Sequence, residues 1–552
     1  MPKIVRGSAE FAGLLALFAA ITAIMFWQWM PHLTSALIGP PEDNQQDFWN
    51  SWYAAIAGKP GSFFFTHMLR FPEGTSLYYQ SFAYPQVFAV AALSHLVGND
   101  LSSLILLQNI TLLMSFPLAG VGAFYLVRHF TPNFMAALLG GIVFAFNPSH
   151  IEHAMHHAHV ASSEFIPFFV LSYLLALERH SVRWLAASII FFVLNALSCW
   201  YYLFYSAYFM IFHFTYTWVR DRKFPRGWPL IAPIACGAGT FILLSPILIP
   251  MAIYILRSAV ENPGGYNTFV ADAAAYVAFP PTHLFSALTD GVYKLLTGYP
   301  WEDTVYLGLI NIGLLAWFYT HAQKSQTRTY ILWGMGVFAV IACGNTLHIF
   351  GHWFLPLPGG ILSQIPFVDF VRAPARIIVF VYLFLSIAIG LAVTEIWQQT
   401  RPAMARLLVA GIAFLMVLDF YPAHIEMAPV SCSPGLALLR DDPDHDFGVL
   451  DLPSGYTEEN AYMMRQVCHG RPIAQGNTSR NIAISLRDRL ETHDLTAQHQ
   501  QLVKARIKYI LLSPPESYDF SWGNAKSAKQ EQYLQAYPVA YRSADLTILR
   551  VY

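Results

Sequence analysis

Charged residues are scarce in this sequence. Only 12% of its 552 residues are Asp, Glu, Lys or Arg, and 55% are hydrophobic, whereas soluble domains carry about 25% charged residues. The formal net charge of −1 excludes a nucleic-acid-binding protein, which needs a basic excess. The composition also excludes a disordered chain and a coiled coil. Repeated apolar runs approach the roughly 20 residues that cross a bilayer, so the chain is predicted to be a membrane protein.

Cysteine is also rare, and the five cysteines have no CxxC spacing. Cys199, Cys236 and Cys343 lie in apolar segments, which argues against a thiolate metal site. A disulfide between Cys432 and Cys468 would require that the C-terminal segment faces an oxidising compartment. The sequence contains no GxGxxG, P-loop or GxSxG pattern and no membrane-protease signature, so these motifs give no sign of nucleotide binding or serine-hydrolase chemistry.

About eleven apolar segments are predicted to be membrane-spanning helices. They cover residues 9–30, 101–127, 133–147, 161–178, 184–199, 201–219, 229–256, 305–321, 329–345, 376–398 and 404–423. The segment 84–97 (YPQVFAVAALSHLV) is apolar too, but it is short. A segment of this length is more often interfacial or re-entrant than spanning.

Basic residues decide how segment 84–97 is placed. Lys3 and Arg6 precede the first span and put the N-terminus on the cytoplasmic side. If 84–97 does not span, the cytoplasmic loops hold Arg128, Arg179, Arg183, Arg220, Arg222, Lys223, Arg226, Lys324, Arg328, Arg401 and Arg406. The outer loops before the tail then hold only Lys59, Arg70, Arg257, Lys294, Arg372 and Arg376. Counting 84–97 as a span would put the basic RDRKFPR segment outside, so 84–97 is predicted to lie along the outer interface.

This topology predicts a mainly α, polytopic membrane protein with two extracytoplasmic parts. The first outer loop, residues 31–100, is expected to carry two interfacial helices. Residues 426–552 are richer in charge and contain the β-like runs FGVLDLP, KYILLS and LTILRVY, so they are predicted to form a small soluble α/β domain. Residues 1–425 form the transmembrane domain. Because the cytoplasmic loops are short, any chemistry is expected on the outer face.

The first candidate site follows the first span, in the segment PEDNQQDFWNSWY. Asp47 is predicted to open an amphipathic helix whose aromatic residues suit the headgroup zone. A carboxylate in the first helical turn is favoured by the helix dipole, so Asp47 could simply cap the helix. A charge so close to an apolar surface is costly unless it has a function. Asp47 is therefore the preferred catalytic candidate, and Glu42 and Asp43 are the competing acids.

A second candidate site is the histidine-rich segment NPSHIEHAMHHAHVASSE in the outer loop after the third span. Its candidate residues are His150, Glu152, His153, His156, His157 and His159. On one helix, residues 150, 153 and 157 would share a face, as would 152, 156 and 159. Imidazoles at this spacing can bind a metal ion, with Asp47, His153 and His157 as candidate ligands, although HEXXH is absent. The alternatives are orientation of an acceptor or a phosphate, or a simple interfacial position.

The segment DFVRAPAR, just before the tenth span, carries the main positive charges of the outer boundary. Arg372 is predicted to bind a lipid phosphate through paired N–H donors. Arg376 is the second candidate, although a snorkelling anchor is favoured for it. Glu302 in GYPWEDTVYLG, and Tyr201 and Tyr202 in SCWYYLFY, are candidates for a substrate groove. A polar loop end and core packing are the simpler explanations for these three residues.

The layout and several short segments resemble the GT-C superfamily of membrane glycosyltransferases, which take sugars from polyprenyl-phosphate carriers. One span is followed by a long outer loop with two interfacial helices; Asp47 occupies the acidic position at the first helix, and Tyr84–Pro85 begins the second. The segments WNSWY, FPEGTSLYY, FNPSHIEHA and VRAPAR resemble a poorly characterised bacterial branch, over about residues 1–425. Only Glu42-Asp43 matches the usual acidic pair, so the choice between Asp47 and Asp43 stays open. The substrate groove would include Trp49 and Tyr84.

The resemblance implies an inverting glycosyltransferase of the cell envelope, acting at the outer face of the bacterial cytoplasmic membrane. Asp47 would be the general base for an acceptor hydroxyl, and Arg372 would neutralise the leaving phosphate. The histidines would border the acceptor or hold a divalent ion; no cofactor is certain, and Mg²⁺ or Mn²⁺ is left open. The expected partners are the lipid bilayer, a polyprenyl-phosphate-sugar donor and an acceptor glycan, lipid or protein, but no nucleic acid.

Two other functions compete with this one: a lipid-linked oligosaccharide flippase or transporter, and a non-catalytic GT-C-like scaffold. A transporter predicts mid-bilayer charges and inverted repeats, whereas the predicted spans are largely free of charge and show no repeat. The discriminating feature is whether Asp47, the histidine cluster and Arg372 converge on one outer-face cavity. A separation above about 15 Å without a shared cleft would exclude catalysis, because proton transfer needs hydrogen-bond reach.

Overall fold

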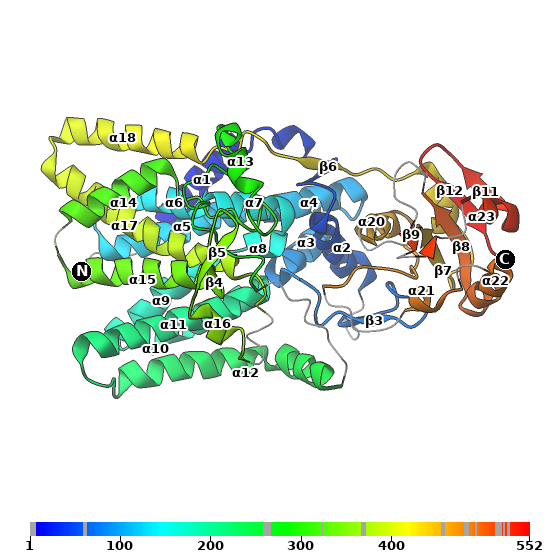
Figure 1. Ribbon diagram of the computed structural model, residues 1–552, viewed down its shortest axis with the longest axis horizontal. Coiled ribbons are helices and arrows are strands. Elements are labelled where there is room, and N and C mark those ends of the chain that lie inside the picture. Colours follow the sequence, from blue (N-terminus) through cyan, green and yellow to red (C-terminus); the bar gives the residue numbers. More distant parts are fainter. Residues whose placement is uncertain are drawn as a thin grey trace.

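The computed structural model is elongated, with a helix bundle at one end and a small β-sheet at the other (Figure 1). The structure describes residues 7–58, 63–257, 266–322, 324–365, 371–453, 459–479, 485–491, 494–513, 521–522, 525–526 and 530–552. Lys3, Arg6 and Lys59, which entered the charge count, lie outside these ranges. So do residues 369–370, at the start of the DFVRAPAR segment.

Every apolar segment that was predicted to span the membrane is helical. The helices are α1 (Ser8–Met25), α4 (Leu101–Leu113), α5 (Ser115–Phe130), α6 (Phe134–Ala145), α9 (Phe165–Arg179), α10 (Val182–Ser198), α11 (Trp200–Asp221), α12 (Trp228–Arg257), α14 (Leu309–His321), α15 (Gln326–Ala342), α17 (Ile378–Gln399) and α18 (Pro402–Asp419). Seven helical stretches of the described chain are long and apolar enough to cross a membrane. The chain is therefore a mainly helical, multi-pass membrane protein, and the count of eleven spans stays a prediction.

Helix α17 forms the centre of the bundle. All but one of its residues from Ile378 to Thr394 are buried, as expected for a helix that is hydrophobic on every side. It packs against α6, α14 and α15. Gly140 of α6 lies so close to α17 that a Cβ there would sit 2.8 Å from the carbonyl oxygen of Ser386. Glycine at this position therefore permits the close approach of the two helices.

The first outer loop carries α2 (Asp43–Trp52) and α3 (Tyr84–Val97). The prediction that Asp47 opens α2 is wrong, because the helix begins at Asp43. Asp43 takes the first-turn position that suits a carboxylate, and Asp47 lies one turn further along the same face. Helix α3 is shorter than the roughly 20 residues of a span. It packs against α2 and α4, and its interfacial position stays a prediction.

The histidine-rich segment does not form one helix. Helix α7 (Pro148–His156) ends just before His157, whose backbone is extended at φ −146° and ψ 81°, and α8 (Ala158–Ala161) follows. The single-helix expectation is therefore wrong. The break turns His157 and His159 away from the face that carries His150 and His153.

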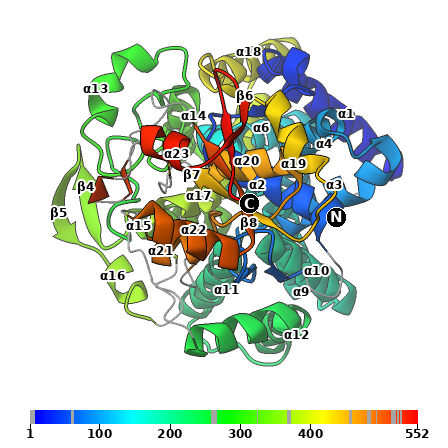
Figure 2. The ribbon, with the colours of Figure 1, turned by 90° about the vertical axis from the view of Figure 1, so that its right-hand side faces the viewer.

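The C-terminal segment contains a four-stranded sheet in the order β11-β12-β8-β7. Strands β7 (Gly448–Leu452) and β8 (Ile507–Leu512) are parallel, while β12 (Thr547–Arg550) pairs antiparallel with β8 and with β11 (Val539–Arg542). The three β-like runs of the sequence are thus β7, β8 and β12. Helices α20 (Glu459–His469), α22 (Leu495–Lys504) and α23 (Gln530–Ala536) accompany the sheet, which Figure 2 shows from its own end of the molecule.

The C-terminal segment and the first outer loop are packed together. Phe48 and Trp49 of α2 belong to the same hydrophobic cluster as Tyr462 and Met463 of α20, and the indole N–H of Trp49 donates to Oε1 of Gln466 at 2.7 Å. Strand β1 (Ala36–Ile38) pairs antiparallel with β6 (Met427–Pro429). The domain division after residue 425 stays a prediction, and the two parts share one core.

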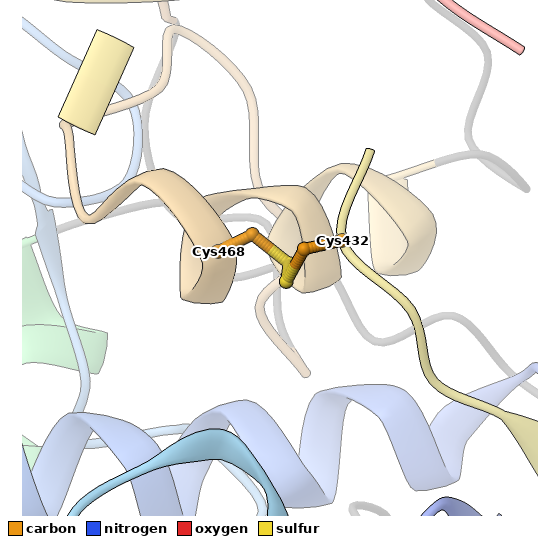
Figure 3. The surroundings of a disulfide bond; sticks show 2 residues. All are labelled: Cys432 and Cys468. Carbon is orange, nitrogen blue, oxygen red and sulfur yellow. A yellow bond between two sulfur atoms is a disulfide. The ribbon is translucent and has the colours of Figure 1, made fainter. Parts of the chain in front are cut away.

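A disulfide joins Cys432, in the chain that follows β6, to Cys468 on α20 (Figure 3). It closes a loop with a sequence separation of 36 residues. Cys199, Cys236 and Cys343 are free and buried. The disulfide therefore ties α20 to the chain that enters the C-terminal segment.

This pairing predicts the thiol content of the protein. Denatured without reductant, each chain should react with a thiol reagent at three cysteines, and at all five after reduction. A Cys432→Ser/Cys468→Ser variant should lose about 3–4 kcal/mol of stability in the loop-entropy view, seen as faster limited proteolysis of the C-terminal segment than in a Cys343→Ser control. Five reactive thiols without reductant would contradict the disulfide.

Candidate active site

A cavity of about 940 Å³ lies where the helix bundle, the first outer loop and the C-terminal segment meet. Its lining comes from α2, the α7–α8 junction, α11, α12, the loop before α14, the chain before α17 and residues near α20. Ten residues predicted from the sequence line it: Glu42, Asp43, Asp47, His156, His157, His159, Tyr201, Glu302, Arg372 and Arg376. Asp47, part of the histidine cluster and Arg372 thus share one cavity, which is the arrangement that the catalytic interpretation requires.

The carboxylate of Asp47 is buried at the turn between α7 and α8. Only 7% of Asp47 is exposed. Its Oδ2 accepts a hydrogen bond from the Ala158 N–H at 3.0 Å, and Nδ1 of His159 lies 3.9 Å from its Oδ1. Burial, reinforced by the negative charge of Asp43, raises the pKa of Asp47 well above its usual value, although the hydrogen bond from Ala158 opposes the change.

Asp43 has a different environment. Its side chain is about half exposed, and its Oδ2 lies 3.4 Å from Nε2 of His157. Burial acts to raise the pKa of Asp43, but the hydrogen bond and charge of His157 outweigh it, so this pKa is lowered. Two carboxylates on one face of α2 therefore have pKa values that are pushed apart. Such a separation suits one acid to proton transfer and the other to a fixed charge.

Glu302 and Arg376 form a buried ion pair beside these acids. Nε of Arg376 donates to Oε2 of Glu302 at 2.9 Å, and its Nη2 donates to Oε1. The guanidinium also lies 4.8 Å from the ring centre of Tyr201. Burial would raise the pKa of Glu302, but the charge and hydrogen bonds of Arg376 hold it far below its usual value. Arg376 is therefore not the snorkelling anchor favoured from sequence, because its charged end is buried and paired.

Arg372 carries a charge that its surroundings leave unneutralised. Within the described part of the chain it has no ion-pair partner. Its guanidinium lies 5.4 Å from the ring centre of Phe269, which begins a column of rings. Centroid distances are 5.7 Å from Phe269 to Tyr299, 4.8 Å from Tyr299 to Trp301 and 4.2 Å from Trp301 to His156. The column positions Arg372 through a cation–π contact, which leaves its N–H donors free.

One wall of the cavity is apolar. Phe204 of α11 and Leu248, Met251 and Ile255 of α12 line it. Phe241 of α12 also lines the cavity, and 57% of this residue is exposed on the outer surface of the bundle. In a membrane protein, such an exposed apolar helix faces lipid. The cavity can therefore take an acyl or polyprenyl chain from the side.

Six other predicted residues do not line the cavity: Trp49, Tyr84, His150, Glu152, His153 and Tyr202. His150 stacks on Phe116 with the ring centroids 4.0 Å apart, and Glu152 accepts a hydrogen bond from Thr282 at 2.7 Å. Nδ1 of His153 lies 3.4 Å from Nδ1 of His157, one layer behind the cavity. The contacts of these residues are those of the supporting protein, and their site roles stay predictions.

The residues of the cavity do not fit a metal centre. In the ranges described above, no three His, Cys, Asp or Glu side chains are grouped so as to hold a metal ion. The cavity acids instead face one imidazole each, at 3.5 Å for Glu42 and His156, 3.4 Å for Asp43 and His157, and 3.9 Å for Asp47 and His159. The ligand set of Asp47, His153 and His157 stays a prediction, and we route no step through a metal.

Several lining residues were missed by sequence reasoning. Trp301 adjoins Glu302, but its place between His156 and Tyr299 has no local signal. The C-terminal segment contributes Asn460, Asn477, Thr478 and Ser479. These residues are far along the chain from the acids, and single amides and hydroxyls in a polar segment give no pattern from which to predict a site.

Three solved structures resemble the chain in fold. The archaeal oligosaccharyltransferase AglB from Archaeoglobus fulgidus, in complex with an inhibitory peptide and a dolichol-phosphate, is 13% identical with a TM-score of 0.52, over 92% of this chain and 70% of that chain. ArnT from Cupriavidus metallidurans in the apo state is 13% identical with a TM-score of 0.50, over 99% of both chains. The arabinofuranosyltransferase AftD from Mycobacteria is 12% identical with a TM-score of 0.55, over 99% of this chain but 40% of that chain.

These neighbours are GT-C glycosyltransferases, so the chain has the GT-C fold that its sequence resembles. The sequence matches no curated protein. A family model described as a domain of unknown function (DUF6311) matches residues 15–421. This match extends from α1 through α18 and includes the acids, the histidines and both arginines of the cavity. The chain therefore belongs to the DUF6311 family.

Proposed function

We propose that the protein is an inverting glycosyltransferase, which moves a hexosyl or pentosyl group from a polyprenyl-phosphate carrier to an acceptor glycan, lipid or protein. One observation carries this proposal: a desolvated acid, Asp47, and an unneutralised cation, Arg372, line a single cavity with an apolar wall. The GT-C fold supports it. One neighbour of that fold was solved with a dolichol-phosphate, a lipid of the class that the apolar wall would accommodate.

In the proposed reaction, the polyprenyl chain lies along α11 and α12 and its phosphate faces Arg372. An acceptor hydroxyl transfers its proton to the ionised carboxylate of Asp47 while its oxygen attacks the anomeric carbon. The bond from that carbon to the phosphate oxygen breaks, and the polyprenyl phosphate leaves with the electron pair. Arg372 stabilises the charge that develops on this phosphate. Attack opposite the leaving group inverts the anomeric carbon.

The proposed location is the outer face of the bacterial cytoplasmic membrane, with the N-terminus cytoplasmic and the C-terminal segment extracytoplasmic. The disulfide between Cys432 and Cys468 supports an oxidising surrounding for that segment. The α11–α12 and α17–α18 connections lie at the end of the molecule away from the sheet (Figure 1). These connections carry Arg222, Lys223 and Arg401, which suits a cytoplasmic position for that end.

An Asp47→Asn variant tests the base. The amide cannot take the acceptor proton, so transfer from a polyprenyl-phosphate-sugar donor should fall at least ~100-fold, as expected when a general base is lost. The assay is release of polyprenyl phosphate by purified protein offered a panel of such donors. Asp290→Asn, on a half-exposed acid remote from the cavity, is the matched control and should keep full activity. Full turnover by Asp47→Asn would remove Asp47 from the reaction.

The raised pKa of Asp47 gives two opposite pH trends. Transfer should increase as the pH rises through this pKa, because only the ionised carboxylate is a base. Stability should change in the other direction: the folded state holds the Asp47 proton more tightly than the unfolded state, so its contribution is complete below the ordinary pKa and lost as the pH rises. Thermal unfolding should therefore show a smaller loss of Tm with rising pH in Asp47→Asn than in wild type; equal slopes would contradict a raised pKa.

The two arginines should respond differently to substitution by glutamine. Arg372→Gln removes a charged partner of the donor phosphate, worth about 1.5–3 kcal/mol, so KM for the donor should rise ~10-fold or more while Tm stays unchanged. Phe269→Leu, which removes only the ring beneath Arg372, should give a smaller rise. Arg376→Gln leaves Glu302 buried without its partner, which costs about 3–5 kcal/mol, and should lower Tm. Arg401→Gln, on an exposed residue at the other end, is the control; an unchanged KM in Arg372→Gln would contradict phosphate binding.

A further inference from the structure

The rim of the cavity opposite the apolar wall is built by the C-terminal segment. Asn460 lies on α20, and Asn477, Thr478 and Ser479 follow in the chain beyond it. Gln46 of α2 completes this rim. All five side chains are uncharged and carry an amide or a hydroxyl. The lipid chain of a donor needs the apolar wall, so the polar rim is the side from which a second substrate enters.

The rim residues are connected to each other and to the acids. Nδ2 of Asn477 donates to Oδ1 of Asn460 at 3.2 Å, and Nδ2 of Asn460 lies 3.5 Å from Oδ1 of Asp43. Nε2 of Gln46 donates to the backbone carbonyl of Asn477 at 3.2 Å. The hydroxyls of Ser479 and Ser81 are 2.7 Å apart. A molecule bound at the rim is thus held directly beside the carboxylates of α2.

The chemistry of the rim favours a ligand with many hydroxyl groups and no charge. An amide offers N–H donors and a carbonyl acceptor, and a hydroxyl offers both roles, which matches the hydroxyls of a sugar. The indole N–H of Trp200, which also lines the cavity, has no hydrogen-bond partner among the residues that the structure describes. An aromatic ring with a free N–H can pack against the apolar face of a sugar ring and donate to one of its hydroxyls.

Other acceptor classes fit the rim less well. An anionic acceptor would meet the negative charges of Glu42 and Asp43 at the rim, whereas Arg376 is already paired with Glu302. An extended peptide is commonly bound by pairing with a free strand edge. None of the described residues that line the cavity belongs to a β-strand. The neutral rim therefore lacks both a countercharge and a backbone edge.

We propose that the acceptor is an uncharged saccharide, bound by Asn460, Asn477 and Ser479 of the C-terminal segment together with Trp200. This inference rests on the proposed glycosyl transfer for its reaction, but saccharide binding at the rim needs no donor. The C-terminal segment is then the acceptor-recognition element, and α20 both holds α2 in place and orients the acceptor hydroxyl toward the acids.

The test uses the full chain in nanodiscs and an array of neutral and acidic oligosaccharides and peptides, with bound protein detected by a label on the scaffold. Wild type should bind neutral oligosaccharides. Asn477→Ala and the milder Ser479→Ala should weaken this binding at least tenfold, and Asp47→Asn should retain it. Gln535→Ala, on an exposed residue of α23, is the matched control for loss of an amide and should bind as wild type does.

The outcomes separate this inference from the proposed function. Preference for peptides or acidic glycans, no binding at all, or neutral-glycan binding that is unaffected by both rim variants would overturn the saccharide acceptor. Donor turnover could still be measured in each of those cases. If neutral glycans bind through the rim but no polyprenyl-phosphate sugar is consumed, the saccharide site stands and the proposed transferase function fails.

Discussion

The desolvation of Asp47 is the constraint on which the site depends. A buried carboxylate keeps its charge only at a high free-energy cost, and the Ala158 N–H is its one strong hydrogen-bond donor among the described residues. Asp43, four residues earlier, adds repulsion. The position of α2 determines this burial, and α2 is held by the core that it shares with α20. A segment far along the chain therefore maintains the chemistry of an acid near the N-terminus.

The two arginines show how partners assign different roles to the same side chain. Arg376 is buried against Glu302, and this pairing keeps Glu302 ionised at the cavity. Arg372 lies only one turn away in sequence but rests on Phe269 instead of on an acid. A ring fixes the direction of a guanidinium without neutralising it. The cavity thus keeps one positive charge for an incoming phosphate beside an apolar wall for its lipid.

The sequence predicted the parts of the structure that depend on local composition. Apolar length located the helices, and basic residues distinguished α3 from a span. Residue chemistry selected Asp47 and Arg372, and both line the cavity. It could not place the start of α2, because several acids near Glu42 suit a first turn equally, and it missed the break at His157. Pairings such as Glu302 with Arg376 depend on tertiary contacts that leave no periodic signal.

The most direct test of catalysis in this cavity is a structure of Asp47→Asn with a polyprenyl-phosphate-sugar analogue. The predicted complex has the phosphate within about 2.7–3.2 Å of the Arg372 guanidinium nitrogens, the lipid chain along α11 and α12, and the anomeric carbon facing residue 47. A phosphate bound outside this cavity, or within it but turned away from Arg372, would contradict the proposed transfer reaction.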